Sequence, residues 1–513
     1  MIFVRTLMPN PLYHSFFERH RDSDALLMIR EDGSQLSYRE FLDIAARYAN
    51  TLVTCGVQPG DRVVLQVPKS AEALAVYAAC VQSGSVMVPL NTGYTADEVD
   101  YFVGDAKPKL VIFDPKNKEG LESICEKHSA QLETLDAVGE GSFASLAAQQ
   151  PKAFQTVERS IDDLAAFLYT SGTTGRSKGA MLTQGNLLSN AEALVETWCF
   201  TPSDVLFHAL PIFHTHGLFV ASNVTFLAGS SMIFMPSFKV QQAIEHLPGA
   251  TTMMGVPTFY TRLLDDARLN RELVQHMRLF ISGSAPLLAE THVAFEERTG
   301  HRILERYGMT ETNMITSNPY DAERRAGTVG HPLPEVEVRI TNQETAVPIP
   351  AGEIGMIEVK GPNVFTGYWN MPEKTAEEFR EDGFFITGDL GQLDEAGYVQ
   401  IVGRSKDLII SGGYNIYPKE IELLLDEQEG VLESAVIGVP HPDFGEGVVG
   451  VLVAKPGVTL DTEAISTAIH SKIARFKQPK QLFVLPELPR NTMGKVQKNV
   501  LRDQYAYVFQ SKD

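Results

Sequence analysis

Short apolar runs between residues 63 and 283 constrain the fold of this 513-residue chain more than any other feature. They read VVLQV, SVMVPL, KLVIF, AAFLYT, VLFHAL, SMIFM and RLFISG, which is typical of buried strands. Amphipathic stretches lie before and between them, and two of these stretches begin with capping boxes, Ser37 with Glu40 and Thr95 with Glu98. The alternation predicts an α/β fold with parallel strands and crossover helices, and so many strands favour two doubly wound sheets.

The character of the sequence changes after about residue 327. The runs VEVRI, GMIEVKG and GYVQIVG alternate apolar and polar residues, and they predict a small antiparallel β unit over about 327–404. The last hundred residues carry enough strand and helix signals for a small α+β domain. We therefore expect a large domain over 1–404 and a smaller, mobile domain over 405–513, joined at Gly403-Arg404-Ser405-Lys406-Asp407.

The composition excludes several classes of protein. Apolar residues make up 44% of the chain and charged residues 21%, which indicates a folded protein with a sizeable core. The 44 basic and 64 acidic residues give a net charge of −20, without a basic cluster for nucleic acid to bind. The longest apolar stretch, Ala73 to Val81, is far shorter than the roughly 20 residues of a membrane helix. We expect neither a nucleic-acid partner nor a membrane span.

Cysteine spacing and the chain ends favour the cytoplasm. Cys55, Cys80, Cys125 and Cys199 lie far apart and have no metal-ligand spacing, which is typical of a reducing compartment. The first residues lack a secretory signal pattern, and the last three residues differ from the peroxisomal Ser-Lys-Leu address. The predicted location is cytoplasmic.

The strongest local signal for chemistry is YTSGTTGRSKG at 169–179, directly after the run AAFLYT. Backbone N–H groups and hydroxyls of a strand-to-helix loop can wrap phosphates, and Lys178 adds a positive charge. The segment is not a Walker A loop, because Ser177-Lys178-Gly179 stands where that loop has Gly-Lys-Ser or Gly-Lys-Thr. A flexible surface loop of the same composition is the alternative.

This segment and four others together resemble the adenylate-forming superfamily of acyl-CoA synthetases, peptide-synthetase adenylation domains and luciferases. The other four are YGMTE at 307–311, TGD at 387–389, GRSKD at 403–407 and PRNTMGK at 489–495. They follow the family's order from about residue 10 to 505. Within the family, the segments HALPIFHTHGLFVASNV, GVPTFYTRLL, RLFISGSAPLL and LERYGMTETNM are similar to those of malonyl-CoA and methylmalonyl-CoA synthetases.

The resemblance implies a two-step ligase reaction. The acid first attacks the α-phosphorus of ATP and expels pyrophosphate, which requires Mg²⁺ and cations around the phosphoryl group, and coenzyme A then displaces AMP. Malonate or methylmalonate would be the acid, with no obligate protein partner. A ligase for another short acid and a carrier-protein-loading adenylation enzyme are the alternatives. A nucleotide-binding regulatory protein with a decayed site is disfavoured, because Glu311, Asp389 and Lys495 are present.

The resemblance also implies which residues bind the nucleotide. The residues implied to contact the phosphates, the adenine or the ribose of ATP are Thr170, Ser171, Gly172, Thr173, Thr174, Lys178, Gly283, Ser284, Ala285, Tyr307, Asp389 and Arg404. Thr310 would approach the α-phosphate, and Glu311 would ligate Mg²⁺, a hard cation that prefers oxygen ligands. Without the family, Glu311 would be an exposed residue at a helix start and Asp389 an ordinary turn former.

The remaining implied roles fall in the C-terminal part. Lys495 would stabilise charge on the carboxylate and the α-phosphate during adenylation, and Lys406 matches the hinge of the small domain. Gly412, Gly413 and Tyr414 would line the channel for coenzyme A. The alternatives are a basic tail, a solvated surface lysine and a simple Gly-Gly turn, respectively.

A dicarboxylic acid would bring a second carboxylate into the acyl pocket, where it needs an arginine or a strong set of donors. Arg262 in GVPTFYTR is the candidate, because a guanidinium forms a two-pronged pair with a carboxylate and the position matches an arginine of malonate-activating relatives. A surface arginine is the alternative. Ser284 and His216 would add donors, whereas Arg278 starts its strand and lies at the wrong end of the sheet.

Overall fold

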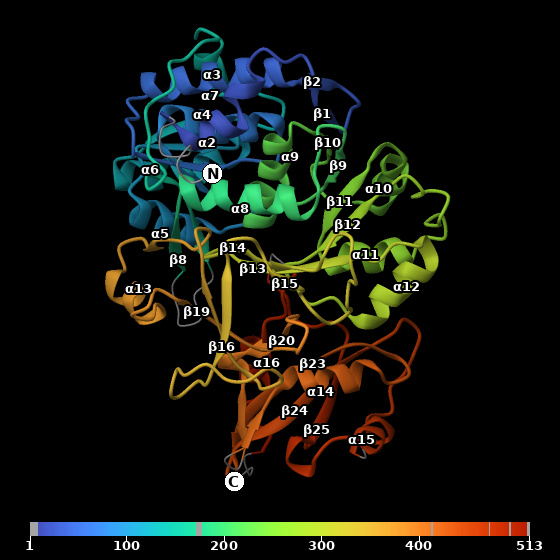
Figure 1. The fold of residues 1–513 in the computed structure, drawn as a ribbon. Helices are drawn as coiled ribbons and strands as arrows, with labels where there is room; N and C mark the ends of the chain where they lie inside the picture. Colours follow the sequence, from blue (N-terminus) through green and yellow to red (C-terminus); the bar gives the residue numbers. More distant parts are fainter. Residues whose placement is uncertain (1–8, 171–176, 412–413, 471, 492–493, 510–513) are drawn as a thin grey trace. The chain divides into compact units, whose positions relative to one another are not determined.

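The computed structural model describes residues 9–170, 177–411, 414–470, 472–491 and 494–509 (Figure 1). The chain divides into two compact units. The first comprises Met1–Val338 with Val359–Phe385, and the second comprises Arg339–Glu358 with Ile386–Asp513. Both units combine helices with β-sheet, so the predicted α/β class is confirmed.

One sheet of the first unit has seven strands in the order β18-β8-β7-β4-β3-β5-β6. Its parallel strands are β3 (Arg62–Gln66), β4 (Val86–Pro89), β5 (Leu110–Phe113), β6 (Gln131–Thr134) and β7 (Leu164–Thr170). Two antiparallel strands extend it beyond β7, namely β8 (Lys178–Thr183) and β18 (Gly367–Tyr368). The helices in its part of the chain are α3 (Tyr38–Thr54), α4 (Ala71–Ser83), α5 (Ala96–Ala106), α6 (Lys118–His128) and α7 (Ser142–Ala147).

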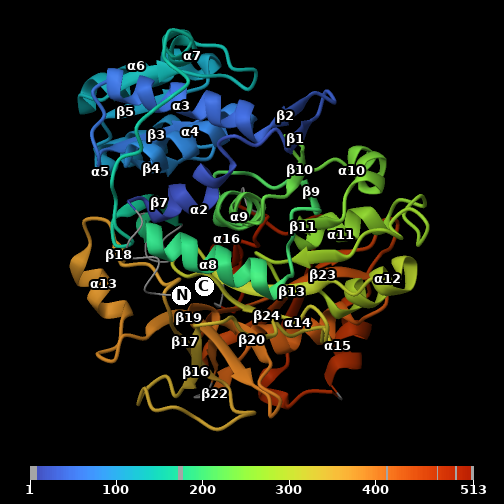
Figure 2. The ribbon, with the colours of Figure 1, turned by 45° about the horizontal axis from the view of Figure 1, so that its top comes forward.

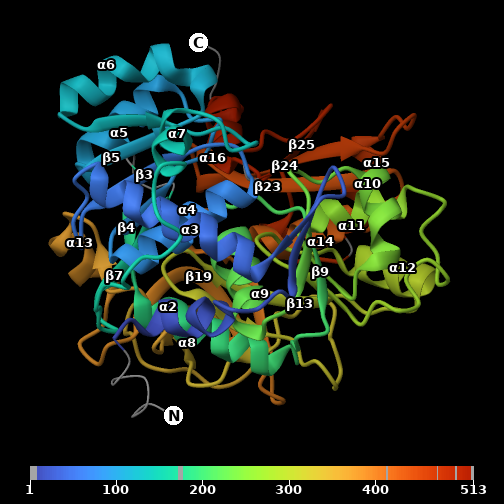
Figure 3. The same cartoon turned by 90° about the horizontal axis from the view of Figure 1, so that it is seen from above.

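Helices α3 and α4 pack against each other, and Figure 3 shows them side by side. Both predicted capping boxes are present. Ser37 caps α3 and exchanges hydrogen bonds with Glu40, and Thr95 caps α5 and does the same with Glu98. Because each box satisfies backbone N–H groups that a helix start leaves unpaired, it fixes where the helix begins.

The other sheet of the first unit has nine strands in the order β15-β14-β13-β12-β11-β9-β10-β1-β2. Its strands are β1 (Leu26–Arg30), β2 (Gln35–Ser37), β9 (Val205–His208), β10 (Ser231–Phe234), β11 (Thr252–Gly255), β12 (Leu279–Ser282), β13 (Leu304–Met309), β14 (Asn313–Ser317) and β15 (His331–Pro332). The strands from β13 to β1 run parallel, whereas β14, β15 and β2 are antiparallel additions at the edges. Two doubly wound sheets were predicted and are confirmed.

The helices around this sheet are α2 (Pro11–Phe16), α8 (Gln184–Thr197), α9 (Asn223–Ala228), α10 (Val240–His246), α11 (Pro257–Leu264) and α12 (Ala289–Thr299), with a π-helix over His216–Ser222. Helices α8 and α9 lie against each other (Figure 2). Helix α13 (Pro372–Glu378) follows β18 and completes the unit.

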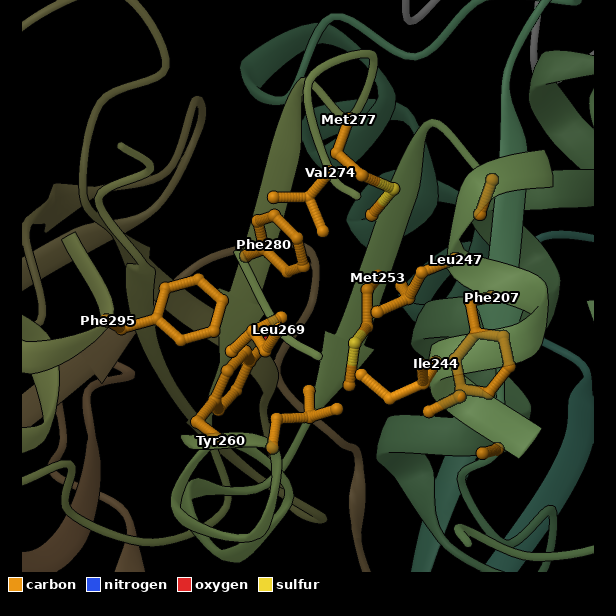
Figure 4. Close-up of a cluster of buried hydrophobic side chains, with 14 of the residues drawn as sticks. Phe207, Ile244, Leu247, Met253, Tyr260, Leu269, Val274, Met277, Phe280 and Phe295 are labelled. Carbon is orange, nitrogen blue, oxygen red and sulfur yellow. The ribbon is translucent and has the colours of Figure 1, made fainter. Parts of the chain in front are cut away.

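A cluster of buried side chains joins β11 and β12 to α10, α11 and α12 (Figure 4). The rings of Tyr260 and Phe280 both pack edge-on to Phe295, with centroid distances of 5.4 and 5.0 Å. The Tyr260 hydroxyl donates a hydrogen bond to the carbonyl of Ile281. These contacts fix the position of α11 relative to the carboxyl end of β12, where candidate site residues follow.

The second unit contains the greater part of a four-stranded sheet, β16 (Glu337–Thr341), β17 (Gly355–Lys360), β19 (Phe385–Leu393) and β20 (Val399–Arg404). A second sheet follows, with strands β21 (Ile409–Ser411), β22 (Tyr414–Ile416), β23 (Val431–His441), β24 (Gly445–Ala454) and β25 (Gln481–Leu485). Its helices are α14 (Pro418–Asp426), α15 (Thr462–His470) and α16 (Lys498–Tyr505). The predicted joint at residues 403–407 and the movement of the smaller domain stay predictions.

None of the helices in the described ranges combines the length and the apolar character that crossing a membrane requires.

Candidate active site

The glycine- and hydroxyl-rich segment connects two antiparallel strands. Thr170 at the end of β7 pairs with Lys178 at the start of β8. The prediction of a strand-to-helix loop was wrong, because the residues after Lys178 pair with β7 and the next helix, α8, begins only after its capping residue Thr183. Four residues implied to bind phosphate lie outside the described residues, namely Ser171, Gly172, Thr173 and Thr174.

Lys178 lies beside two side chains from the segment that follows residue 367. Its Nζ is 3.0 Å from Oε1 of Glu378 and 4.0 Å from the ring centroid of Tyr368. Its side chain is only 12% exposed. A buried lysine is most stable beside an anion, so Lys178 is suited to pair with a phosphate or a carboxylate.

Glu311 lies with Thr310 in the short turn between the antiparallel strands β13 and β14. It is 6% exposed, so the alternative of an exposed glutamate at a helix start is wrong. Its Oε1 lies 3.1 Å from the hydroxyl of Tyr368. A buried carboxylate fits a hard cation such as Mg²⁺. The described ranges contain no group of three or more acidic, histidine or cysteine side chains that could hold a metal ion.

Residues implied to line the adenine follow β12. Gly283, Ser284 and Ala285 come directly after its last residue, at the carboxyl end of a parallel strand, where ligands of such sheets bind. Ser284 has a φ of +71°, a left-handed conformation that is uncommon outside glycine and often marks a functional site. Its Oγ is 3.2 Å from Nδ1 of His216, the first residue of the π-helix. The structure therefore brings Ser284 and His216 together.

The same region contains a buried arginine that we did not predict. Arg306 in β13 is 4% exposed, and its Nε and Nη2 have no hydrogen-bond partner among the described residues. A Cβ built on Gly283 would come within 2.3 Å of the Arg306 Cζ, so only glycine allows the guanidinium to lie there. Burial lowers the pKa of Arg306 to about 9, which leaves it charged at neutral pH.

His216 faces this arginine as a neutral ring. Burial and the charge of Arg306 hold the pKa of His216 well below its usual value. Its Nε2 is buried and has no partner in the part of the chain that the structure describes. Arg306, His216 and Ser284 thus offer several donors in one apolar region, which matches the oxygen atoms of an anion.

The two arginines weighed from the sequence differ from Arg306 in their surroundings. Arg262 is exposed on α11, two residues after the buried Tyr260 and therefore on another side of the helix. Arg278 precedes β12 and forms an ion pair with Asp204, whose Oδ1 is 2.6 Å from its Nε. Arg278 therefore lies at the amino end of the strand, as expected, and its guanidinium is paired with Asp204.

Asp389, implied to bind the ribose, and Arg404, implied to contact the ribose or a phosphate, are paired across the four-stranded sheet. They stand opposite each other in β19 and β20, and Oδ1 of Asp389 is 2.6 Å from Nε of Arg404. The Asp389 side chain is only 5% exposed. A carboxylate fixed in this way is suited to accept hydrogen bonds from two neighbouring hydroxyl groups.

Lys495 lies at the end of a tight turn. Its backbone N–H donates to Oδ1 of Asn491 at 3.0 Å, and its carbonyl accepts from the N–H of the same residue. Gly494 has a φ of +74°, which a residue with a side chain rarely adopts. The turn fixes the Lys495 backbone and leaves the residue exposed.

The other implied residues of the second unit are only partly described. Lys406 lies in the 3₁₀ turn Ser405–Asp407, and burial lowers its pKa. Gly412 and Gly413 lie outside the described residues. Tyr414 is exposed and stacks on Phe476, with ring centroids 4.5 Å apart.

Comparisons with known proteins identify the family. The model of a family described as AMP-binding enzyme matches residues 14–369, and that of its C-terminal domain matches residues 420–495. The chain belongs to the AMP-binding enzyme family. The resemblance inferred from the sequence motifs is therefore confirmed.

Several members of this family are similar over almost the full chain. A malonate–CoA ligase from Arabidopsis thaliana is 35% identical, over 96% of this chain and 88% of the relative. A mitochondrial malonate–CoA ligase from Mus musculus is 34% identical, over 94% of this chain and 88% of the relative. The crystal structure of ATP-bound MatB from Rhodopseudomonas palustris has 56% identity and a TM-score of 0.96, covering 98% of this chain and 100% of that chain.

Proposed function

We propose that this AMP-binding enzyme is an AMP-forming ligase that converts malonate to malonyl-CoA. ATP and malonate would react to malonyl-adenylate and pyrophosphate, and coenzyme A would then release AMP. The observation that carries the choice of acid is Arg306, a buried cation with unpaired donors beside His216 and Ser284.

The energetics of Arg306 favour a dicarboxylic acid. An unpaired buried charge costs several kcal/mol. A carboxylate that accepts two hydrogen bonds from the guanidinium offsets much of that cost. A monocarboxylic acid of the same size would leave the guanidinium unpaired. The malonate–CoA ligases among the relatives point to the same acid. Methylmalonate has the same second carboxylate, so it is the nearest competitor as a substrate.

The nucleotide roles are part of the proposal. The phosphate contacts are assigned to residues 170–174 and Lys178, the adenine contacts to Gly283, Ser284, Ala285 and Tyr307, and the ribose contacts to Asp389 and Arg404. Thr310 is assigned to the α-phosphate. Mg²⁺, when bound by Glu311, would neutralise charge on the phosphates.

The remaining assignments are also proposals. Lys495 would approach the reacting carboxylate and α-phosphate, Lys406 would act as the hinge, and Gly412, Gly413 and Tyr414 would line the coenzyme A channel. Arg262 stays a candidate contact for the distal carboxylate at the exposed side of α11. We also propose a cytoplasmic enzyme whose partners are the small molecules malonate, ATP and coenzyme A.

The substrate is tested by release of AMP with malonate, methylmalonate, succinate, acetate, propionate and a medium-chain acid, each with ATP, Mg²⁺ and coenzyme A. We expect kcat/KM for malonate or methylmalonate to exceed that for propionate by about 10²-fold or more, because one missing partner of a buried charge costs at least this much. Preference for a monocarboxylic acid would refute the malonate assignment and leave the adenylate mechanism intact.

A further inference from the structure

Four side chains of the first unit form a continuous chain of polar contacts. Nζ of Lys178 is 3.0 Å from Oε1 of Glu378, and the other oxygen of Glu378 accepts a 2.6 Å hydrogen bond from the Tyr368 hydroxyl. That hydroxyl also lies 3.1 Å from Oε1 of Glu311. The contacts therefore link the lysine proposed to hold phosphate with the glutamate proposed to hold Mg²⁺.

Backbone pairing brings these residues together from distant parts of the chain. Tyr368 in β18 pairs with Ala180, two residues after Lys178 in β8. Three residues before Tyr368, the N–H of Phe365 donates to the carbonyl of Glu311 at 2.8 Å. Glu378 ends α13, the helix that follows β18. Backbone pairing therefore places Tyr368 near Lys178 and Glu311, and α13 carries Glu378.

These contacts join two donor groups, the Lys178 ammonium and the Tyr368 hydroxyl, to three carboxylate oxygens of Glu378 and Glu311. The Tyr368 hydroxyl carries one hydrogen and has two carboxylate oxygens within hydrogen-bond distance, Oε2 of Glu378 at 2.6 Å and Oε1 of Glu311 at 3.1 Å. Burial raises the pKa of Glu378, but hydrogen bonds from Tyr368 and Lys178 outweigh it and lower the pKa overall. Glu378 is therefore an anion, and it occupies Lys178.

We propose that Glu378 is a resident counter-ion of Lys178 that competes with the phosphates of ATP and pyrophosphate and weakens the binding of both. This rests on the proposed function, because it requires that Lys178 binds the phosphates of ATP. The Lys178 ammonium has three N–H donors, and Glu378 accepts one of them, so a phosphate oxygen would bind a cation whose charge Glu378 already partly neutralises. Glu378 then competes with the triphosphate for the same positive charge.

Glu378 contacts a second cation besides Lys178. Nζ of Lys374, one helical turn earlier in α13, is 3.2 Å from the same Oε1, and its side chain is 36% exposed. This partner keeps Glu378 from being left unpaired beside the phosphates. The arrangement weakens the binding of both ATP and pyrophosphate, and weaker pyrophosphate binding speeds release of the first product.

The test is calorimetric titration of ATP with Mg²⁺, and separately of pyrophosphate with Mg²⁺, into the wild-type protein, Glu378→Gln and Glu377→Gln. Glu377 is the matched control, because it lies next to Glu378 and its side chain is 67% exposed. Its Oε2 forms an ion pair with Nζ of Lys374 at 3.0 Å. Glutamine at 378 retains the shape and an acceptor for Tyr368. We expect Glu378→Gln to bind ATP and pyrophosphate about fivefold more tightly, the upper range for losing a partly exposed ion pair, with KM for malonate unchanged.

Equal or weaker ATP and pyrophosphate binding by Glu378→Gln, compared with Glu377→Gln, would overturn the inference. Glu378→Ala serves as a second variant, because a purely structural role would weaken ATP binding in both variants and lower their melting temperatures. A wild-type protein that does not bind ATP would refute the proposed function itself. Normal wild-type binding with no tightening in either variant would refute only the role of Glu378.

Discussion

Replacement of Lys495 by alanine is expected to lower adenylation by at least about 10²-fold, the effect of losing one donor that stabilises the transition state. The turn that ends at Lys495 holds its backbone through Asn491, so the substitution removes the charged side chain and leaves the turn intact. The measurement is malonate-dependent exchange between pyrophosphate and ATP, which reports adenylation alone.

The second half of the reaction is the internal control. Malonyl-adenylate supplied directly to Lys495→Ala should still react with coenzyme A, because the lysine acts only in adenylation. Lys498→Ala is the matched variant, since Lys498 lies in the same basic tail and pairs with Glu422. Substantial exchange by folded Lys495→Ala, or an equal loss in Lys498→Ala, would remove the catalytic assignment.

Arg306→Met is expected to lower kcat/KM for malonate by about 10²-fold or more, because the distal carboxylate would be buried without its partner. Activity with propionate should fall much less, since propionate has no second carboxylate. The melting temperature should not fall, because methionine replaces a buried and incompletely paired charge. A parallel loss of malonate activity and stability would instead indicate a structural role.

Arg262→Met is the matched control for this variant. The exposed position of Arg262 predicts a smaller effect on malonate activity than that of Arg306→Met, and the reverse order would restore the choice made from the sequence.

The pH dependence of the wild-type enzyme gives a second test of the role of Arg306. The pKa of Arg306 is about 9, and only the charged form attracts the carboxylate, so kcat/KM for malonate should fall as pH rises through about 9 while that for propionate does not.

Much of the fold was predictable because buried parallel strands have a recognisable apolar sequence. Strands such as β3, β4 and β9 lie within one or two residues of the predicted runs, since burial on both faces requires a continuous apolar sequence. Strands β8 and β18 were missed. Strand β18 forms through pairing with a distant segment, as Tyr368 pairs with Ala180, and no local periodicity indicates such a pairing. Strand β8 pairs with the preceding strand β7.

Residues of the candidate site were predictable where they belong to recognisable sequence motifs. Asp389 and Arg404 were chosen from separate motifs, and the sheet register places them opposite each other. Arg306 was missed because the sequence LERYGM does not reveal that Glu305 and Arg306, which point to opposite faces of β13, are both buried. Glu378 was missed for a similar reason, since it ends a helix rich in charged residues and only the tertiary fold brings it to Lys178.

The central claim, that malonate is activated by transfer of the AMP group of ATP to its carboxylate with loss of pyrophosphate, is tested most directly with malonate labelled with ¹⁸O in both carboxylates. Incubation with ATP, Mg²⁺ and coenzyme A should give malonyl-CoA, AMP and pyrophosphate in equal amounts, and mass spectrometry should find one ¹⁸O atom in the AMP. Unlabelled AMP, or label recovered in phosphate together with ADP, would contradict the proposed reaction.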